Sequence, residues 1–411
     1  MKFLVLGAGR MGYAVAYDLI RSNKQNVKKI VVADENRANL ESLMENLADE
    51  RIVPVQLDVR KSQDVAAIMS EMDVAIACIA YEHNYELAKI ALSTHTHFVD
   101  LGGNEEVVAR QFTLDEVARD EQVAIIPDLG LAPGLVSLLA VSAASTLDEV
   151  YEMKLRVGGL PVEADDLLLN YAQVFSIDGL INEYVEDCTI IRNGKLARVP
   201  SLTELEEIEF PRPFGKMEAF TTSGGISTMP QTYLGKVHNL DYKTIRYKGH
   251  CAAVKALKDI GLMDSNPITL EPEGIKVPPR RILHELLSQR LLKGEPDVVL
   301  VQVVVTGVKD KKPLQYVWQC IDYNEQAAGL SAMMRMTAFP ASIIAQMLAR
   351  NDIKERGVLR QESVVPIKLF LAEMDSRGIN LQMIEREPAL HLVVAMQKKI
   401  AIFCPKNIRT R

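Results

Sequence analysis

A glycine-rich turn near the N-terminus constrains the fold of this chain more than any other feature. The apolar run Lys2–Leu6 is followed by Gly7-Ala8-Gly9-Arg10-Met11-Gly12, and a helical apolar pattern begins directly after it. A second apolar run, residues 29–33, ends in Asp34. A strand, a glycine-rich turn, a helix and a second strand with an acid at its end are typical of a dinucleotide-binding domain.

Each position of this motif has a physical role. Gly7 permits a tight turn, Gly9 lets the backbone approach a pyrophosphate, and Gly12 lets the helix pack closely on the strand. The helix N-terminus offers free N–H groups and the positive end of its dipole to phosphates. Asp34, roughly 20 residues beyond Gly12, is placed to accept hydrogen bonds from ribose hydroxyls. That carboxylate would repel a 2′-phosphate, so NAD is the predicted cofactor, with Arg37 leaving NADP as an alternative.

The alternation of strands and helices continues to about residue 127. Strand-like runs at residues 52–57, 74–80, 97–101 and 123–127 are separated by helical patterns, which indicates a parallel sheet. Ligands of such sheets lie outside the carboxyl ends of the strands, so Asp58 is expected near the adenine and Ala80 and Tyr81 near the nicotinamide. The predicted cofactor contacts are Gly7, Gly9, Arg10, Met11, Gly12, Asp34, Asp58, Ala80 and Tyr81.

The pattern changes after about Thr146. Strands are predicted at residues 149–157, 241–247, 298–306 and 315–321, with fewer helices between them, which favours an α+β domain with a largely antiparallel sheet. A long apolar helix at residues 330–349 has no strand after it and is expected to pack back on the first domain. We therefore predict an α/β chain, with a Rossmann doubly wound parallel sheet followed by a second α+β domain.

Composition and charge exclude several classes of protein. With 411 residues, a formal charge of −7 and no apolar run long enough to span a bilayer, the chain suits neither nucleic acid nor a membrane. The first apolar run is too short for a signal peptide, so a cytoplasmic location is expected. The five cysteines show no CxxC spacing and are expected to be reduced. His95 and His97 lack a third ligand, so no metal site is predicted.

Three features in the sequence are candidates for the substrate site. Asp128 follows an apolar strand and precedes the turn Gly130–Gly134, where it is either a site residue or a helix cap. Arg246 has the planar fork that binds carboxylates, but a strand arginine can equally form a surface ion pair. Thr222 and Ser223 belong to a segment of hydroxyls and glycines, residues 219–228, that lines a pocket or forms a simple turn.

Taken together, these segments resemble the saccharopine dehydrogenase family. The likeness covers roughly residues 1–378 and rests on the Gly7–Gly12 turn with Asp34, residues 127–134, Gly158-Gly159-Leu160-Pro161, residues 243–250 and residues 337–340. It implies a Rossmann domain at 1–130 completed by C-terminal helices at about 328–378, a substrate-binding and oligomerisation domain at 131–327, and a homodimer or homotetramer. Residues 379–411 fall outside it and have no predicted role.

Within the family, residues 174–180, 190–195 and 222–225 look like those of the L-lysine 6-dehydrogenases. Saccharopine reductases carry an Asn-Arg-Asp type segment where this chain has Thr222-Ser223-Gly224, and an Asp at the position of Ala132. Saccharopine has three carboxylates, so the absent arginine favours a smaller substrate.

The resemblance implies NAD-dependent oxidative deamination of the ε-amino group of L-lysine. The product would be allysine, which cyclises to piperideine-6-carboxylate as ammonia is released. Arg246, with Thr222 and Ser223, is expected to bind the substrate, while Asp128 and His250 are expected to transfer protons. The alternatives are a saccharopine- or carboxynorspermidine-type reductase that makes a secondary amine, and a non-catalytic NAD-binding regulatory protein.

Overall fold

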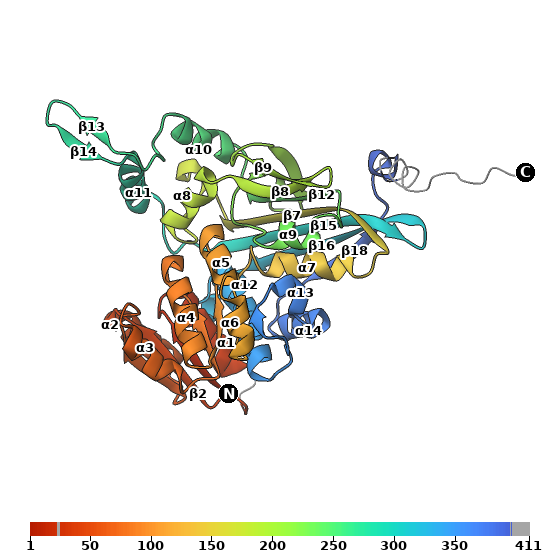
Figure 1. Cartoon of the computed structure of the whole chain (residues 1–411). Coiled ribbons are helices and arrows are strands. Elements are labelled where there is room, and N and C mark those ends of the chain that lie inside the picture. Colours follow the sequence, from red (N-terminus) through yellow and green to blue (C-terminus); the bar gives the residue numbers. More distant parts are fainter. Residues whose placement is uncertain (23–24, 395, 397–411) are drawn as a thin grey trace, which may run out of the picture.

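Two β-sheets, one above the other, organise the molecule (Figure 1). The computed structural model describes residues 1–22, 25–394 and 396. The first sheet is parallel and has the strand order β17-β6-β5-β4-β1-β2-β3. Its strands are β1 (Lys2–Leu6), β2 (Lys29–Asp34), β3 (Ile52–Gln56), β4 (Val74–Ala77), β5 (His97–Asp100), β6 (Ala124–Ile126) and β17 (Gly357–Val358).

Helices cover both faces of the first sheet because its strands are apolar on both sides. One face packs against α1 (Arg10–Arg21), α2 (Arg37–Leu47) and α12 (Ala332–Ala349), and the other against α3 (Ser62–Met69), α4 (Asn84–Ser93) and α6 (Asp115–Asp120). The short helices η1 (Tyr81–His83) and α5 (Glu105–Phe112) follow the carboxyl ends of β4 and β5.

The second sheet is mixed and has the path β10-β11-β12-β7-β15-β16-β18. Only the pairing of β12 with β7 is parallel among the pairs along this path within the described residues. The strands are β7 (Glu149–Pro161), β10 (Glu206–Phe210), β11 (Gly215–Thr221), β12 (Asn239–Arg246), β15 (Asp297–Lys309), β16 (Lys312–Tyr323) and β18 (Gln382–Arg386), with β8 (Cys188–Arg192) and β9 (Lys195–Val199) as a side hairpin.

Smaller elements surround this sheet. They are α8 (Ile177–Val185), α9 (Met229–Tyr233), α10 (His250–Asp259), α11 (Pro279–Arg290), the short helices η2 (Leu168–Asn170) and η3 (Gln326–Ala328), and the hairpin of β13 (Ile268–Leu270) and β14 (Ile275–Val277). The predicted fold class, a doubly wound parallel sheet with a second α+β domain, is confirmed.

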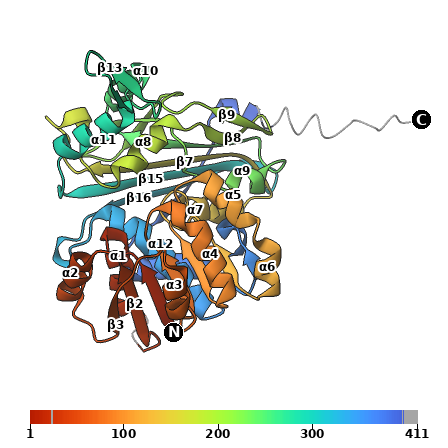
Figure 2. The same cartoon turned by 60° about the vertical axis from the view of Figure 1, so that its left-hand side comes forward.

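Helices α7 (Leu135–Ala144) and α12 lie between the two sheets (Figure 2). Helix α12 packs on α1, β4 and β5 below and on β15 and β16 above, so its residues are buried almost throughout. The chain then adds β17 to the first sheet, α13 (Gln361–Val364) and α14 (Ile367–Ser376) beside α7, and β18 to the second sheet. Part of the segment that had no predicted role is therefore a strand, and residues 397–411 lie outside the described residues.

A buried ion pair joins the C-terminal helices to the first domain. Asp18 of α1 is 3% exposed, and Arg377 donates from Nε to its Oδ1 at 2.6 Å. Ser342 of α12 donates to the other carboxylate oxygen at 2.6 Å. These bonds satisfy a carboxylate that would otherwise be buried at a high cost in solvation.

Replacing Arg377 with Met should lower the free energy of unfolding by about 3 kcal/mol, because Asp18 would keep a buried charge without its cation. Urea denaturation of the purified protein measures this difference. As the control, Arg37→Met removes an exposed partner of Glu41, with side chains 77% and 58% exposed, and should change stability by less than ~0.5 kcal/mol. Equal losses in both variants would contradict the structural role of Arg377.

Candidate functional site

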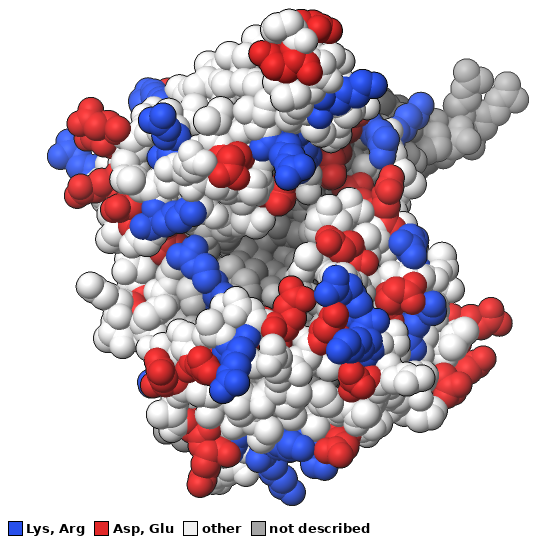
Figure 3. Space-filling model, turned by 90° about the vertical axis from the view of Figure 1, so that its left-hand side faces the viewer, with Lys and Arg blue, Asp and Glu red and all other residues white. Residues whose placement is uncertain are grey.

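The carboxyl edge of the first sheet faces the second sheet across a cleft. Figure 3 shows a hollow between the upper and lower halves of the molecule, with charged side chains of both signs around its rim. The glycine-rich turn, the loops after β5 and β6, and one face of β7 and β12 meet in this region. The site therefore lies where ligands of open parallel sheets bind.

The glycine-rich turn has the shape that a pyrophosphate requires. Gly7 adopts φ +100°, and a Cβ on Gly12 would lie 1.8 Å from the carbonyl oxygen of Gly7, so neither position tolerates a side chain. Gly9 caps the N-terminus of α1, and the space around it is open, with nothing within 4 Å of an added Cβ. This cradle fits the phosphates of a dinucleotide.

The acid predicted at the ribose lies beside this turn. Asp34 Oδ2 accepts a hydrogen bond from the Ala8 backbone at 2.7 Å, and Oδ1 accepts one from the Asn36 backbone at 2.7 Å. Glu35 follows directly and pairs with Arg60 at 3.5 Å. The end of β2 thus carries two carboxylates, Asp34 and Glu35, near the expected position of the adenosine ribose of a dinucleotide.

The other predicted cofactor residues occupy the same edge. Asp58 accepts two hydrogen bonds from the Arg60 guanidinium, at 2.8 and 2.9 Å, which lower the pKa of its carboxyl to about 2. Ala80 leads into η1, where the Tyr81 hydroxyl lies 3.5 Å from Asn182 Nδ2 across the cleft. Arg10 and Met11 begin α1, and Arg10 Nη1 reaches the carbonyl of Val174 at 3.5 Å.

A cavity of about 190 Å³ connects this edge to the second sheet. Its walls are mostly apolar, and its ionisable groups among the described residues are Glu183, Tyr242 and Arg246. The lining residues are Met11, Leu101, Gly130, Leu131, Ala132, Pro133, Val157, Gly159, Phe175, Glu183, Tyr242, Thr244, Arg246, Met333 and Thr337. Arg246 and Met11, predicted from sequence for substrate and cofactor, thus share one cavity.

Arg246 is held rigidly at the end of β12. It is 2% exposed, its Nε donates to the Tyr184 hydroxyl at 3.2 Å, and its Nη1 donates to the Ile245 carbonyl at 3.0 Å. The guanidinium carbon lies 5.0 Å from the centroid of the Tyr171 ring. The carboxylate of Glu183 lies 3.7 Å from Nη2. These contacts fix the guanidinium with one edge toward the cavity.

His250 does not occupy the position that proton transfer to a substrate would need. Its Nε2 is bonded to the Tyr184 hydroxyl at 2.8 Å and its Nδ1 to the Leu169 carbonyl at 2.7 Å. Burial, together with the positive charge of Arg246, lowers the pKa of the imidazole to about 3. Because Leu169 offers only an acceptor, Nδ1 carries the proton and Nε2 accepts from Tyr184. His250 therefore orients Tyr184, which in turn holds Arg246.

Asp128 lies beside the cavity rather than in it. Its backbone adopts φ +62°, and its carboxylate accepts a hydrogen bond from Ser227 of the second domain. Burial and the nearby charge of Asp100 raise the pKa of the carboxyl to about 7. A Cβ on Gly102 would lie 1.7 Å from Asp128 Oδ1, so the loop after β5 covers this carboxylate. In this arrangement Asp128 joins the two domains and does not face the cavity.

The hydroxyls of Thr222 and Ser223 are hydrogen-bonded to other protein groups. The Thr222 hydroxyl is bonded to the hydroxyl of Thr244 at 2.7 Å, and Ser223 Oγ donates to the Asn182 carbonyl at 3.3 Å. A Cβ on Gly225 would lie 2.3 Å from ring atoms of Tyr242. Thr222 and Ser223 are not among the lining residues of the cavity, whereas Thr244, to which Thr222 is bonded, does line it.

Glu183 is a cavity residue that the sequence did not indicate. Burial raises the pKa of its carboxyl to about 7, while the charge of Arg246 lowers it. The buried residues of α8 are Ile177, Leu180, Ile181 and Tyr184, the spacing of an ordinary core-facing helix. An acid on the flank of such a helix usually faces solvent, so only the tertiary arrangement identifies Glu183.

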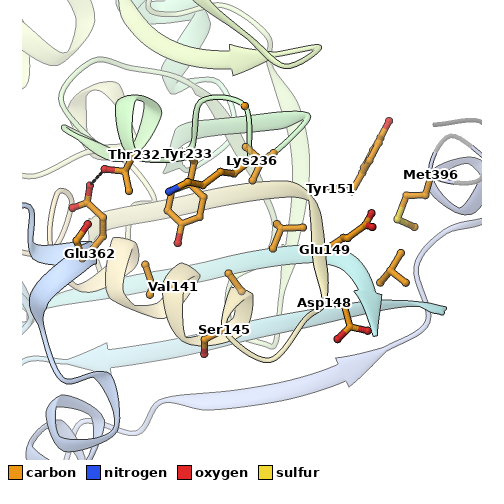
Figure 4. Close-up of a pocket in the computed structure, with 16 residues that line it drawn as sticks. Val141, Ser145, Asp148, Glu149, Tyr151, Thr232, Tyr233, Lys236, Glu362 and Met396 are labelled. Carbon is orange, nitrogen blue, oxygen red and sulfur yellow. Dashed lines mark hydrogen bonds between the residues drawn. The ribbon is translucent and has the colours of Figure 1, made fainter. Parts of the chain in front are cut away.

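Other hollows lie away from these residues. A groove of about 900 Å³ runs between the end of α7, the start of β7 and the segment around Tyr233 (Figure 4). It contains none of the predicted site residues, and Glu362 at one end is bonded to Thr232. Within the described residues no group of three His, Cys, Asp or Glu side chains could hold a metal, and no helix is long and apolar enough to cross a membrane.

Two family models together match most of the chain. The saccharopine dehydrogenase NADP binding domain matches residues 3–126, and the saccharopine dehydrogenase C-terminal domain matches residues 130–379. The mitochondrial alpha-aminoadipic semialdehyde synthase of Mus musculus is 25% identical over 372 residues, covering 87% of this chain and 39% of the relative. The NADP(+)-dependent, L-glutamate-forming saccharopine dehydrogenase of Saccharomyces cerevisiae is 26% identical over 281 residues, covering 66% and 60%. The chain thus spans less than two thirds of the length of these curated relatives.

Solved structures show the same fold. Apo saccharopine dehydrogenase (L-Glu forming) from Saccharomyces cerevisiae has a TM-score of 0.74 at 20% identity, covering 94% of this chain and 99% of that one. Homospermidine synthase from Legionella pneumophila in complex with NAD has a TM-score of 0.61 at 12% identity, covering 94% and 92%. At these identities the likeness concerns the fold alone. The family models cover both domains, and the chain belongs to the saccharopine dehydrogenase family, as its motifs predicted.

Proposed function

We propose that this protein oxidises the ε-amino group of L-lysine with NAD, forming allysine and releasing ammonia. The observation that carries the proposal is the charge of the cavity. Among its described lining residues Arg246 alone is positively charged, which suits a substrate with one carboxylate. The three carboxylates of saccharopine would call for further cations. Ala132 lines the cavity at the position where saccharopine reductases carry an Asp.

The glycine-rich turn, Asp34 and the N-terminus of α1 would hold the cofactor, and a bound nicotinamide supplies the hydride acceptor. The carboxylates of Asp34 and Glu35 disfavour a 2′-phosphate, and Arg60 is already paired with Glu35 and Asp58. These charges support NAD over NADP.

The apolar walls of the cavity act on the reacting amine. A lysine ammonium has a reference pKa of ~10.4 and cannot lose hydride from the adjacent carbon while protonated. Leu101, Pro133 and Met333 offer no partner for a charged group, so desolvation favours the neutral amine. Loss of hydride from Cε then leaves an iminium, which water hydrolyses to the aldehyde and ammonia. The aldehyde closes on the α-amine to form piperideine-6-carboxylate.

A three-way assay tests the reaction. The first mixture, L-lysine with NAD, should form NADH and ammonia. Two other mixtures should give little turnover: saccharopine with NADP, and lysine with 2-oxoglutarate and NADPH. An L-glutamate-forming saccharopine dehydrogenase, which the names of the relatives favour, would instead oxidise saccharopine with NADP and leave lysine unreacted. Turnover of lysine with 2-oxoglutarate and NADPH would indicate a reductase that forms the secondary amine from lysine. A protein that binds NAD but turns over none of these mixtures would be the non-catalytic alternative.

Replacing Asp34 with Ser should weaken the preference for NAD over NADP, because it removes the carboxylate that repels a 2′-phosphate. The ratio of kcat/KM for the two cofactors at saturating lysine measures this preference. Glu41→Gln, which removes an exposed acid from α2, is the control. An unchanged ratio in Asp34→Ser would contradict the placement of Asp34 at the ribose.

Replacing Arg246 with Ala should lower kcat/KM for L-lysine about tenfold to a few hundredfold, since hydrogen bonds to charged groups contribute roughly 1.5–3 kcal/mol. Arg246→Lys keeps the charge but loses the planar fork and should also be impaired. Cadaverine has no carboxylate, so both variants should oxidise it nearly as well as the wild type does. Equal damage towards lysine and cadaverine would mean that Arg246 only stabilises the fold.

A further inference from the structure

Two opposite charges lie side by side in the lining of the cavity. The Arg246 guanidinium is buried, and the Glu183 carboxylate, on a side chain 30% exposed, lies 3.7 Å from its Nη2. A charge-assisted hydrogen bond between such groups is about 2.7–2.9 Å long, so the two are near each other without being bonded. The hydrogen bonds of Arg246 to described residues leave from Nε and Nη1, so Nη2 remains available to a ligand.

The separation of these charges limits what they can hold. The two amino groups of an extended lysine lie roughly 7 Å apart, whereas its α-carboxylate and α-ammonium share one carbon and lie about 3 Å apart. The 3.7 Å between Arg246 Nη2 and Glu183 matches the short spacing within the head group better than the long spacing between the head group and the ε-nitrogen. Glu183 is therefore well placed for the α-nitrogen.

We propose that Arg246 and Glu183 together bind the zwitterionic head of an α-amino acid, the guanidinium its carboxylate and Glu183 its α-ammonium. This inference rests on the proposed function and adds the basis of substrate selection. The reacting amine then lies against the apolar lining residues of the cavity.

The electrostatics of Glu183 agree with this role. Burial raises the pKa of its carboxyl to about 7, and the positive charge of Arg246 opposes that rise. An α-ammonium next to it would add a second positive charge and favour the ionised form. The bound head group would thereby be paired with protein charges of opposite sign on both of its groups.

Four substrates separate the two contacts. L-lysine carries both head groups, 6-aminohexanoate lacks the α-amine, cadaverine lacks the carboxylate, and pentylamine lacks both. Steady-state NADH formation is measured for each with wild type, Glu183→Gln and Arg246→Ala. Because each variant is compared with itself across substrates, a general loss of folded enzyme cancels.

Glu183→Gln should lower kcat/KM for L-lysine about tenfold to a hundredfold and leave 6-aminohexanoate within about twofold of wild type. Arg246→Ala should show a different selectivity. Its kcat/KM should fall for both lysine and 6-aminohexanoate and change little for cadaverine. Asp178→Asn is the matched control, because it removes a carboxylate of α8 that is 65% exposed and outside the cavity. It should leave kcat/KM unchanged for all four substrates.

An equal fall in kcat/KM for lysine and for 6-aminohexanoate in Glu183→Gln would overturn the inference and place Glu183 at the reacting amine. A pH profile identifies that case, since wild-type kcat/KM for 6-aminohexanoate would then rise through a pKa near 7 that the variant lacks. Calorimetric binding of L-lysine and 6-aminohexanoate is measured in parallel and does not depend on turnover.

The two readouts distinguish the two proposals. Lysine that binds in a Glu183-dependent way without turnover would refute the proposed reaction and retain the head-group site. Turnover or binding of lysine that is unaffected by Glu183→Gln would refute the head-group site alone. Absence of both binding and turnover in the wild type would refute both.

Discussion

The site depends on one shared hydrophobic layer, formed by α7 and α12 between the two sheets. Helix α12 packs on β4 and β5 on one side and on β15 and β16 on the other, so neither sheet can move without exposing its apolar residues. Thr337 and Met333 of the same helix line the cavity. The packing that holds the two domains together therefore also sets the distance between the glycine-rich turn and β12.

Within that frame, the burial of Arg246 governs the chemistry that the cavity can perform. An isolated guanidinium is costly to remove from water, and this one is stabilised by the ring of Tyr171, the hydroxyl of Tyr184 and the charge of Glu183. His250 adds to this by accepting a hydrogen bond from the Tyr184 hydroxyl, whose oxygen in turn accepts one from Arg246 Nε. The result is a fixed cation whose unused edge faces a small, mostly apolar space.

The sequence predicted what depends on local order and missed what depends on contact between distant segments. The turn Gly7–Gly12, the acid at Asp34 and the strands of the first sheet follow from spacing alone, because strand, turn and helix are adjacent in the chain. His250 and Glu183 could not be assigned this way. A histidine after a glycine gives no sign that both ring nitrogens will be occupied by Tyr184 and Leu169, and a helix-flank glutamate gives no sign that β12 will place Arg246 beside it.

Under the proposed function, the reacting amine would need no carboxylate beside it. The sequence suggested Asp128 for proton transfer. Its carboxylate accepts a hydrogen bond from Ser227 and is covered by the loop that contains Gly102. Besides Glu183 and Arg246, the cavity is lined by apolar residues that include Leu101, Pro133 and Met333. An ammonium placed against these residues would lose its hydration without gaining a partner, so the proposed reaction would favour binding of the neutral amine. In that reaction the ammonium would give its proton to water before it enters the cavity, and the lone pair of the neutral amine would be available when hydride leaves Cε.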